Sequence, residues 1–452
     1  MDAWTLAKTR VEHIRNGRLS REAFKAKQLA RFRRFVGYVQ RRSPYYAEVI
    51  REHRIDVKKC RPEDFPIQTK QTVMENFDDL VTDRSVTKKA VSEFCAHSHD
   101  HLDLFDDRHF ALHTSGSSGE VGYFVHSKAD MVRGILSVLR VSPPPKLKKV
   151  QMAIAYVGAL GGHFTSPTIM TAHQHSILKP FFPPTMISIN DPLDEIVAQL
   201  NAAQPDLLGS YGSMLSLLAE KQLSGELNVS PSIVRNGAEP LTLQTRSLVK
   251  RAFGVDVQNL YGSTEHLLMG YGLPAYRGMY LMEDFVSYEL EPDCTLVTNF
   301  ANHTQPLIRY RMDDVLVPAA DPDPIFPFTK VEDVVGRVEH TPIFLNRHGR
   351  EDFLSPMFLV DIAIVGLRRY QFDLIDQTSF VFRMEAASGT GPEAREKLNR
   401  EARDWLNKLL IQKQMDNVTF DIELVDDIPI DAKSGKFKLI LPPNQQSAPL
   451  VG

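Results

Sequence analysis

The sequence predicts an α/β protein in two parts, a large N-terminal α/β domain and a small α+β domain at the C-terminal end. Between about residues 104 and 335, short apolar runs alternate with amphipathic segments, as in a sheet whose strands are joined by crossover helices. After "VVGRVEH" this alternation stops, and strand and helix patterns with apolar positions of their own follow, which places the boundary near Gly336 to His340. The expected domains are therefore residues 1–337 and 338–452.

The N-terminal region is rich in Lys and Arg and is expected to be helical. Apolar residues recur there at helical spacing, namely Leu29, Phe32, Phe35, Val36 and Val39. A basic amphipathic helix can bind a membrane surface or a partner. We favour the simpler interpretation of a helix docked on the protein, with its basic face in water.

In the central region, four strands are expected to alternate with three helices. The strands are "VQMAIAYV", "DLLGSYG", "PSIVRNGAE" and "GVDVQNLYGSTE", and the helices are "LDEIVAQLNAA", "SMLSLLAEKQL" and "TLQTRSLVKRAF". Ligands of such sheets bind at the loops beyond the carboxyl ends of the strands. In the C-terminal part, "SFVFRMEAA" and "NVTFDIELVDDIPI" are expected as strands around a helix over "PEAREKLNREARDWLNKLLIQK".

Composition excludes several classes of protein. The 452 residues are 43% hydrophobic with a net charge of -3, which is typical of a globular protein and not of one built to bind nucleic acid. Three scattered cysteines without a CxxC pair indicate a reducing compartment. Because no apolar run reaches the roughly 20 residues of a membrane helix, we expect no membrane span and a cytoplasmic location. The oligomeric state stays open.

The stretch "TSGSSGEVG" could bind phosphate. It lacks the spacing and the closing Lys-Ser/Thr of a Walker A loop. Its glycines nevertheless let successive backbone N–H groups point at one anion, and its hydroxyls add donors. A surface linker has the same composition, so this stretch alone does not decide between the two interpretations.

A second motif favours nucleotide chemistry. "NLYGSTEH" places Tyr261, Thr264 and Glu265 directly after a predicted strand. An aromatic ring can stack on a base, a hydroxyl can bond a phosphate, and a carboxylate can hold Mg2+. "RNGAEPL" precedes this motif, and "PLIRYRMDDV", "VVGRVEH" and "DAKSGKF" follow it.

In this order and spacing, the motifs resemble those of the adenylate-forming (ANL) superfamily, most closely its phenylacetate–CoA ligase branch. "SPYYAEVIREHRIDVKKCRPEDFPIQTKQTV" also resembles the N-terminal region of that branch. The resemblance implies an ATP- and Mg2+-dependent ligase that converts an aromatic or hydrophobic carboxylic acid into an acyl-adenylate and transfers the acyl group to coenzyme A. Transfer to an amine or to a carrier protein remains an alternative, as does a non-catalytic nucleotide-binding homologue.

The resemblance also implies roles for individual residues. The loop that grips the β and γ phosphates would be Thr114, Ser115, Gly116, Ser117, Ser118 and Gly119. The adenine would lie against Gly237, Ala238 and Glu239, with Tyr261 of the segment Tyr261, Gly262 and Ser263 stacked on it. Thr264 would bond the α-phosphate, Glu265 would bind Mg2+, and Asp314 would hold the ribose with help from Arg337 at the hinge. Lys436 would be the mobile catalytic lysine. The acyl pocket would be formed by Tyr156, Gly158, His163, Tyr211 and Gly212.

The chain departs from the family pattern at three motifs. Glu120 stands where the phosphate loop often has a lysine. The "RYRMDDV" motif offers two aspartates, of which the register favours Asp314 over Asp313 as the ribose ligand. The hinge reads "GRVEHT", which makes Glu339 or His340 the expected pivot.

The segment "CAHSHDH" contains four possible metal ligands at alternate positions, Cys95, His97, His99 and His101. An extended strand would place them on one face, but ligands at every second residue of one strand do not readily converge on a tetrahedral ion. We therefore expect a solvated polar loop and no structural metal.

Overall fold

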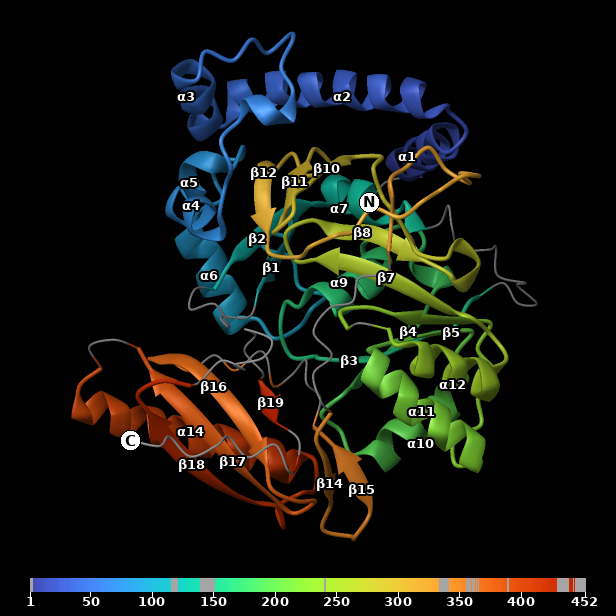
Figure 1. Ribbon diagram of the computed structural model, residues 1–452, viewed down its shortest axis with the longest axis vertical. Helices are drawn as coiled ribbons and strands as arrows, with labels where there is room; N and C mark the ends of the chain where they lie inside the picture. Colours follow the sequence, from blue (N-terminus) through green and yellow to red (C-terminus); the bar gives the residue numbers. More distant parts are fainter. Residues whose placement is uncertain are drawn as a thin grey trace.

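The computed structural model describes residues 3–114, 121–138, 151–239, 241–332, 341–354, 359, 362, 364, 366–387, 390–428, 439–441 and 443 (Figure 1). The α-helices are α1 (Ala3–Asn16), α2 (Arg21–Arg42), α3 (Pro44–Glu52), α4 (Lys70–Glu75), α5 (Phe77–Leu80), α6 (Lys88–His97), α7 (Lys128–Ile135), α9 (Thr165–Thr171), α10 (Leu193–Ala203), α11 (Gly212–Ser224), α12 (Leu243–Phe253) and α14 (Pro392–Gln412). Short 3-10 turns occupy Pro62–Asp64, Ala172–His175, Lys179–Phe181 and Pro274–Tyr276.

The strands of the first two thirds are β1 (His109–His113), β2 (Tyr123–Ser127), β3 (Ile154–Gly158), β4 (Pro184–Ser188), β5 (Leu207–Ser210), β6 (Ile233–Asn236), β7 (Val257–Ser263), β8 (Leu267–Gly272) and β9 (Met279–Leu281). The later strands are β10 (Val286–Leu290), β11 (Thr295–Asn299), β12 (Leu307–Met312), β13 (Lys330–Val331), β14 (Ile343–Leu345), β15 (Glu351–Phe353), β16 (Leu367–Leu374), β17 (Ser379–Ala386), β18 (Thr419–Val425) and β19 (Ile440–Leu441).

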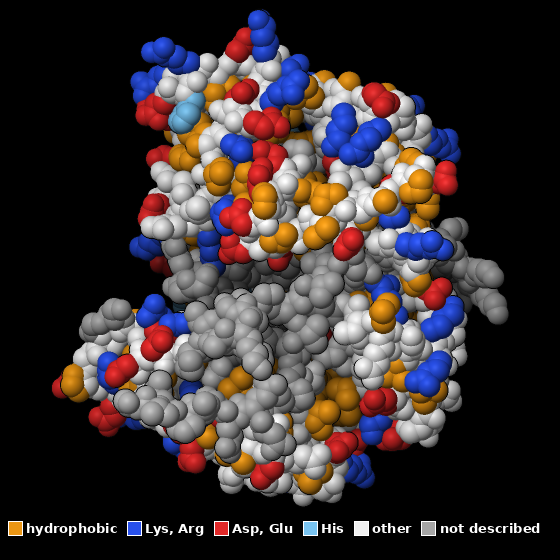
Figure 2. All heavy atoms as spheres, viewed as in Figure 1, with side chains coloured by type: hydrophobic (Ala, Val, Ile, Leu, Met, Phe, Trp, Pro, Cys, Tyr) orange, Lys and Arg blue, Asp and Glu red, His pale blue; other side chains and the backbone are white. Residues whose placement is uncertain are grey.

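The basic N-terminal region forms two helices that dock on the protein. Ser20 lies between the two helices and caps the N-terminus of α2. Its hydroxyl accepts a hydrogen bond from the Ala23 N–H. The predicted apolar stripe of α2 is buried, with Phe32 and Val36 1% and 0% exposed. The docked-helix interpretation is therefore confirmed. Lys and Arg side chains alternate with Asp and Glu side chains over the face of the molecule in Figure 2.

The centre of the fold is an eight-stranded sheet in the order β13-β9-β8-β7-β6-β5-β3-β4. Strands β4, β3, β5, β6 and β7 are parallel. Four of them, β3, β5, β6 and β7, overlap the four strand segments that the sequence predicts, whereas β4 was not predicted. The remaining strands, β8, β9 and β13, extend the sheet in antiparallel pairing. The parallel part confirms the expected α/β fold, whereas the antiparallel extension was not expected.

Helices cover both faces of the parallel strands (Figure 1). On one face, Val157, Leu208 and Val234 pack with α10, α11 and α12. On the other face, Ile154, Leu207 and Ile233 form a row that contacts Met170 of α9. Because successive strand residues point to opposite faces, the residues that follow this second row by two positions also face α9.

The smaller sheets build the N-terminal side of the fold. The hairpin of β1 and β2 and the antiparallel β10-β11-β12 sheet share a hydrophobic core with α2 and α3. Phe32, Tyr46 and Phe300 lie in this core and are each 1% exposed. Cys95 and His97 belong to the last turns of α6, so the expectation of a loop is wrong for these two residues.

The C-terminal residues form a second sheet, in the order β18-β17-β16-β19, with α14 beside it (Figure 1). Phe372, Phe382 and Leu406 lie in a core made of residues from this part of the chain. The proposed boundary at residues 337 and 338 lies outside the described residues, so the exact division stays a prediction. No helix within the described ranges is long and apolar enough to cross a membrane.

Candidate functional site

A cleft of about 570 Å³ lies at the carboxyl ends of the parallel strands. It brings together ten residues that the sequence predicts as site residues: Thr114, Tyr156, Tyr211, Gly237, Ala238, Gly262, Ser263, Thr264, Glu265 and Asp314. These residues come from separate segments of the chain, between residues 114 and 314. Their convergence in one cleft is the main structural finding about the predicted site.

The glycine- and serine-rich stretch connects β1 to β2. Its ends are held together, because the Thr114 N–H donates to the Gly122 carbonyl at 2.8 Å and the Gly122 N–H donates to Thr114 Oγ1 at 2.9 Å. Thr114 lines the cleft. Residues 115–119 and Glu120 lie outside the described residues, as do Arg337 and Lys436.

The "YGSTE" motif forms the end of β7 and its turn into β8. The two strands approach so closely at Gly262 that a Cβ there would lie 2.4 Å from the Leu267 carbonyl oxygen. Glycine at this position is therefore required by the hairpin. Thr264 Oγ1 accepts a hydrogen bond of 2.8 Å from the hydroxyl of Thr165, the first residue of α9.

Glu265 presents its carboxylate to the cleft. Tyr310 on β12 donates a hydrogen bond of 3.2 Å to its Oε1. Burial raises the pKa of the Glu265 carboxyl, while hydrogen bonds and the charge of Lys70 oppose that rise. Mg2+ is typically held by one or two carboxylates together with substrate phosphates. The Glu265 carboxylate fits that requirement, because it lines the cleft next to Thr264.

Lys70, which sequence reasoning missed, begins α4 and lies beside the same region. Its Cε would be 3.0 Å from a Cβ placed on Gly122, close to the Thr114 hydroxyl. It therefore brings a positive charge near both Glu265 and the entrance of the predicted phosphate loop. Lys70 lies 44 positions before Thr114 in the chain, so no local motif indicates this proximity.

Asp314 is joined to the aromatic residue of the motif. The Tyr261 hydroxyl donates to Asp314 Oδ2 at 2.8 Å, and the Asp314 backbone carbonyl accepts from Thr295 Oγ1 at 2.7 Å. Asp313 instead has a side chain that is 96% exposed, next to Arg311. This geometry agrees with the choice of Asp314 over Asp313.

Glu239 does not line the cleft. Its carboxylate accepts hydrogen bonds from the N–H and the hydroxyl of Ser213 at 2.8 and 3.0 Å, in the first turn of α11. Gly212 is the first residue of that helix and is buried. Ala238, the residue before Glu239, lines the cleft and has a left-handed backbone with φ of 64°. Glu239 thus fixes the turn that carries Gly237 and Ala238.

The predicted acyl-pocket residues divide into two groups. Tyr156 and Tyr211 line the cleft with their rings perpendicular, 6.3 Å apart between centroids. A Cβ on Gly158 would lie 2.4 Å from the Tyr156 ring, so this glycine makes room for the ring. His163 is 1% exposed and lies outside the cleft lining, where its Nε2 is 2.9 Å from the Ser98 hydroxyl. Burial, reinforced by His113, lowers the pKa of His163 to about 4.

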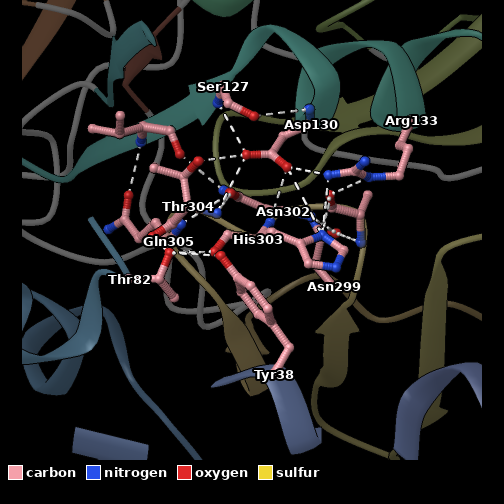
Figure 3. A network of polar contacts seen from close by, with 12 residues as sticks. Tyr38, Thr82, Ser127, Asp130, Arg133, Asn299, Asn302, His303, Thr304 and Gln305 are labelled. Atoms are coloured by element: carbon pink, nitrogen blue, oxygen red, sulfur yellow. Dashed lines mark hydrogen bonds and ion pairs between the residues drawn. The ribbon is translucent and has the colours of Figure 1, made fainter. Parts of the chain in front are cut away.

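A buried polar network surrounds Asp130 (Figure 3). Asp130 on α7 accepts hydrogen bonds from the Thr304 hydroxyl at 2.6 Å and the His303 N–H at 3.1 Å, and it pairs with Arg133. Burial alone would raise the pKa of Asp130, but the charge of Arg133 and these hydrogen bonds hold it at about 2. The network fastens α7 to the loop that follows β11.

Comparison with known proteins agrees with this architecture. No protein-family model matches the chain. It is 23% identical over 305 residues to Protein CapK of Staphylococcus aureus, covering 64% of this chain and 61% of CapK. A structure of 2-hydroxyisobutyryl-CoA ligase with 2-HIB-AMP and CoA in the thioesterification state superposes with a TM-score of 0.58 at 16% identity, over 94% of this chain and 91% of the ligase. Its open conformation gives 0.54 at 16% identity, over 95% and 93%.

The chain has the fold of AMP-forming CoA ligases. The expected fold class, a large α/β part followed by a smaller α+β part, is thereby confirmed. The phenylacetate–CoA ligase branch stays a prediction. Thr165 lies outside the ordered motifs. Lys70 and Tyr310 lie within segments that carry the resemblance, but no role in the site was predicted for either, and their proximity to Glu265 appears only in the structure.

Proposed function

We propose that this protein is an ATP-dependent carboxylic-acid ligase that forms an acyl-adenylate and pyrophosphate, and then transfers the acyl group to coenzyme A. The observation that carries the proposal is the convergence of Thr114, Thr264, Glu265 and Asp314 on one cleft. Each has a side chain suited to one part of ATP or to its Mg2+, and the four come from three separate segments of the chain. The fold shared with 2-hydroxyisobutyryl-CoA ligase supports the same reaction class.

The reaction requires a carboxylate oxygen to attack the α-phosphorus of ATP. A bond forms between that oxygen and phosphorus, the bond from phosphorus to pyrophosphate breaks, and an acyl-adenylate results. Because both reactants are anions, the site must offset their repulsion. Mg2+, when bound through Glu265 and phosphate oxygens, would neutralise part of the phosphate charge.

The chain's own residues then orient the reactants. Thr264, whose Oγ1 accepts a hydrogen bond from the Thr165 hydroxyl, would donate a hydrogen bond to an α-phosphate oxygen. Asp314, held by Tyr261, would accept hydrogen bonds from the ribose hydroxyls. Lys70 adds positive charge beside the predicted phosphate loop, where Glu120 replaces the lysine common in the family.

The role of Lys436 rests on the resemblance alone. We assign it to the bridge between the substrate carboxylate and the α-phosphate, for which a compact charge on a flexible stem is suited. The acid is expected to be aromatic or hydrophobic, since Ile169, Met170 and Leu268 line the cleft. In the second half-reaction the coenzyme A sulfur would attack the acyl carbon, and AMP would leave.

The test is pyrophosphate release by the purified chain with ATP, Mg2+ and a panel of aryl and aliphatic acids. We expect release that depends on the acid, followed by thioester formation when coenzyme A is added. Glu265→Gln serves as the inactive control. Tight ATP binding without release for any acid would instead support a non-catalytic nucleotide-binding protein, and product formation only with amines would support an amide ligase.

A further inference from the structure

Four residues form a row across the sheet beneath the cleft. Tyr156 on β3, Gly209 on β5, Arg235 on β6 and Gln258 on β7 are successive register partners, so their side chains leave the same face of the sheet. This is the face that contacts α9. Tyr156, Gly209 and Arg235 all line the cleft.

Gly209 makes a notch in the middle of this row. It has no side chain, and a Cβ there would lie 3.3 Å from both the Met170 methyl group and the Tyr156 ring. The notch therefore lies between a phenol on one side and a guanidinium on the other. Its position within β5, before the strand end, places it deeper than the Gly237–Ala238 turn of the proposed nucleotide site.

A polar group borders the notch. The Tyr156 hydroxyl is buried there, near the side chains of Tyr211 and Ser166, and makes no hydrogen bond of good geometry within the described residues. Buried polar atoms of this kind need a partner, and a ligand can supply it. The nearby walls are apolar, with Ile169 and Met170 contributed by α9.

Arg235 supplies a positive charge to this deep end. Its Nε donates to the Gln258 carboxamide oxygen at 2.9 Å, which orients the guanidinium in the row. Burial lowers the pKa of Arg235 to about 10, so the group stays charged at neutral pH. A guanidinium suits a carboxylate because its planar fork can donate two parallel hydrogen bonds.

We propose that Arg235 selects acids that carry a second carboxylate, separated by an apolar body from the carboxylate that is activated. This inference rests on the proposed function and names its substrate class. The apolar body packs against Met170 and its neighbours, the distal carboxylate pairs with Arg235, and the Tyr156 hydroxyl donates to it. The substrate is then an aromatic or aliphatic dicarboxylic acid.

The test uses matched acids that differ only in the distal carboxylate: hexanoate with adipate, octanoate with suberate, and phenylacetate with para-carboxyphenylacetate. The readout is kcat/KM for pyrophosphate release. We expect the diacid of at least one pair to be preferred by the wild-type protein. Arg235→Met should lower its kcat/KM by about a hundredfold, as for loss of a hydrogen bond between charged groups, and change the monoacid value less than about threefold.

Two further variants control this comparison. Arg251→Met removes an exposed arginine of α12 and should leave both acids unchanged. Arg235→Lys keeps the charge and should keep part of the diacid preference, which also covers the case in which Arg235→Met fails to fold. A preference for the monoacid in every pair, or an equal loss for both acids in Arg235→Met, overturns the proposal.

Direct binding separates this inference from the proposed function. Calorimetry with suberate or para-carboxyphenylacetate alone needs no ATP chemistry. If no acid releases pyrophosphate, the proposed function fails, but diacid binding that is lost in Arg235→Met and partly kept in Arg235→Lys still supports the deep carboxylate site. Absence of diacid binding together with monoacid turnover overturns the inference and leaves the ligase proposal intact.

Discussion

Lys413 holds the C-terminal part of the protein against the large sheet, and its removal should be costly. Its Nζ lies 2.9 Å from Asp352 Oδ1, and both side chains are 1% exposed. The same Nζ donates to the Asp191 carbonyl at 2.8 Å, and Asp352 Oδ2 accepts from the Leu193 N–H at 3.0 Å. The pair thus joins the end of α14 and strand β15 to the start of α10.

The perturbation is Lys413→Met, which keeps most of the side-chain volume and removes the charge. It leaves the Asp352 carboxylate buried without its cation, and breaking a buried pair in this way costs about 3–5 kcal/mol. The expected loss is of that size in the free energy of unfolding. The double variant Lys413→Met with Asp352→Asn should lose less, because the unpaired charge is then removed.

The assay is urea unfolding followed by far-UV circular dichroism and by tryptophan fluorescence, to which Trp4 of α1 and Trp405 of α14 contribute. The matched control is Arg350→Met, which breaks an ion pair to Asp194 at the same junction. That pair is exposed, 68% for the arginine and 43% for the aspartate, so its loss should cost less than about 1 kcal/mol. Equal effects of Lys413→Met and Arg350→Met would refute the reasoning.

Three further predictions concern the motif and its surroundings. Glu265→Gln should reduce pyrophosphate release by at least about a hundredfold with little change in the melting temperature, and a variant of near wild-type activity would contradict its role. Burial lowers the pKa of His126 to about 4. Burial, together with the nearby His126, lowers the pKa of His266 to about 3. Both imidazoles therefore stay neutral in the folded protein, whereas in the unfolded chain they take up protons below about pH 6.5. Stability should therefore fall on acidification from about pH 6.5 to 4, by up to about 1.4 kcal/mol per pH unit for each histidine, and His126→Gln should flatten this slope in urea titrations. Gly262→Ala should destabilise the protein by about 1–3 kcal/mol because its Cβ meets a carbonyl oxygen of β8, whereas Gly237→Ala, which faces open space, should melt within about two degrees of the wild type.

The parallel core could be predicted because its signals are local. The segment "LDEIVAQLNAA" coincides with α10, since its apolar spacing and acidic first turn are properties of the helix itself. The antiparallel extension was harder to predict. β8 is buried along its whole length, so its sequence "LLMGYG" lacks the alternation that marks a half-exposed strand. Its pairing with β7 depends on the close approach at Gly262, which only the folded backbone shows.

The part of the candidate site that could be predicted consists of residues within the ordered motifs. Thr264 and Asp314 are examples: the motifs can be recognised in the sequence, and both residues line the cleft. Lys70 lies 44 positions before Thr114, and Tyr310, although it belongs to the "RYRMDDV" motif, reaches Glu265 only through the fold, so neither contact could be predicted from the sequence. Arg235 does have a local signal, because a charged residue among the apolar residues of the predicted strand "PSIVRNGAE" indicates a functional or paired position.

The most direct test of the account follows an oxygen atom from the acid to AMP. The acid is labelled with a heavy oxygen isotope in its carboxylate and incubated with the protein, ATP, Mg2+ and coenzyme A, and the nucleotide products are analysed by mass spectrometry. Attack of the carboxylate on the α-phosphorus predicts AMP that carries one labelled oxygen, together with unlabelled pyrophosphate. Formation of ADP, or AMP without label in the presence of thioester product, would contradict the acyl-adenylate mechanism.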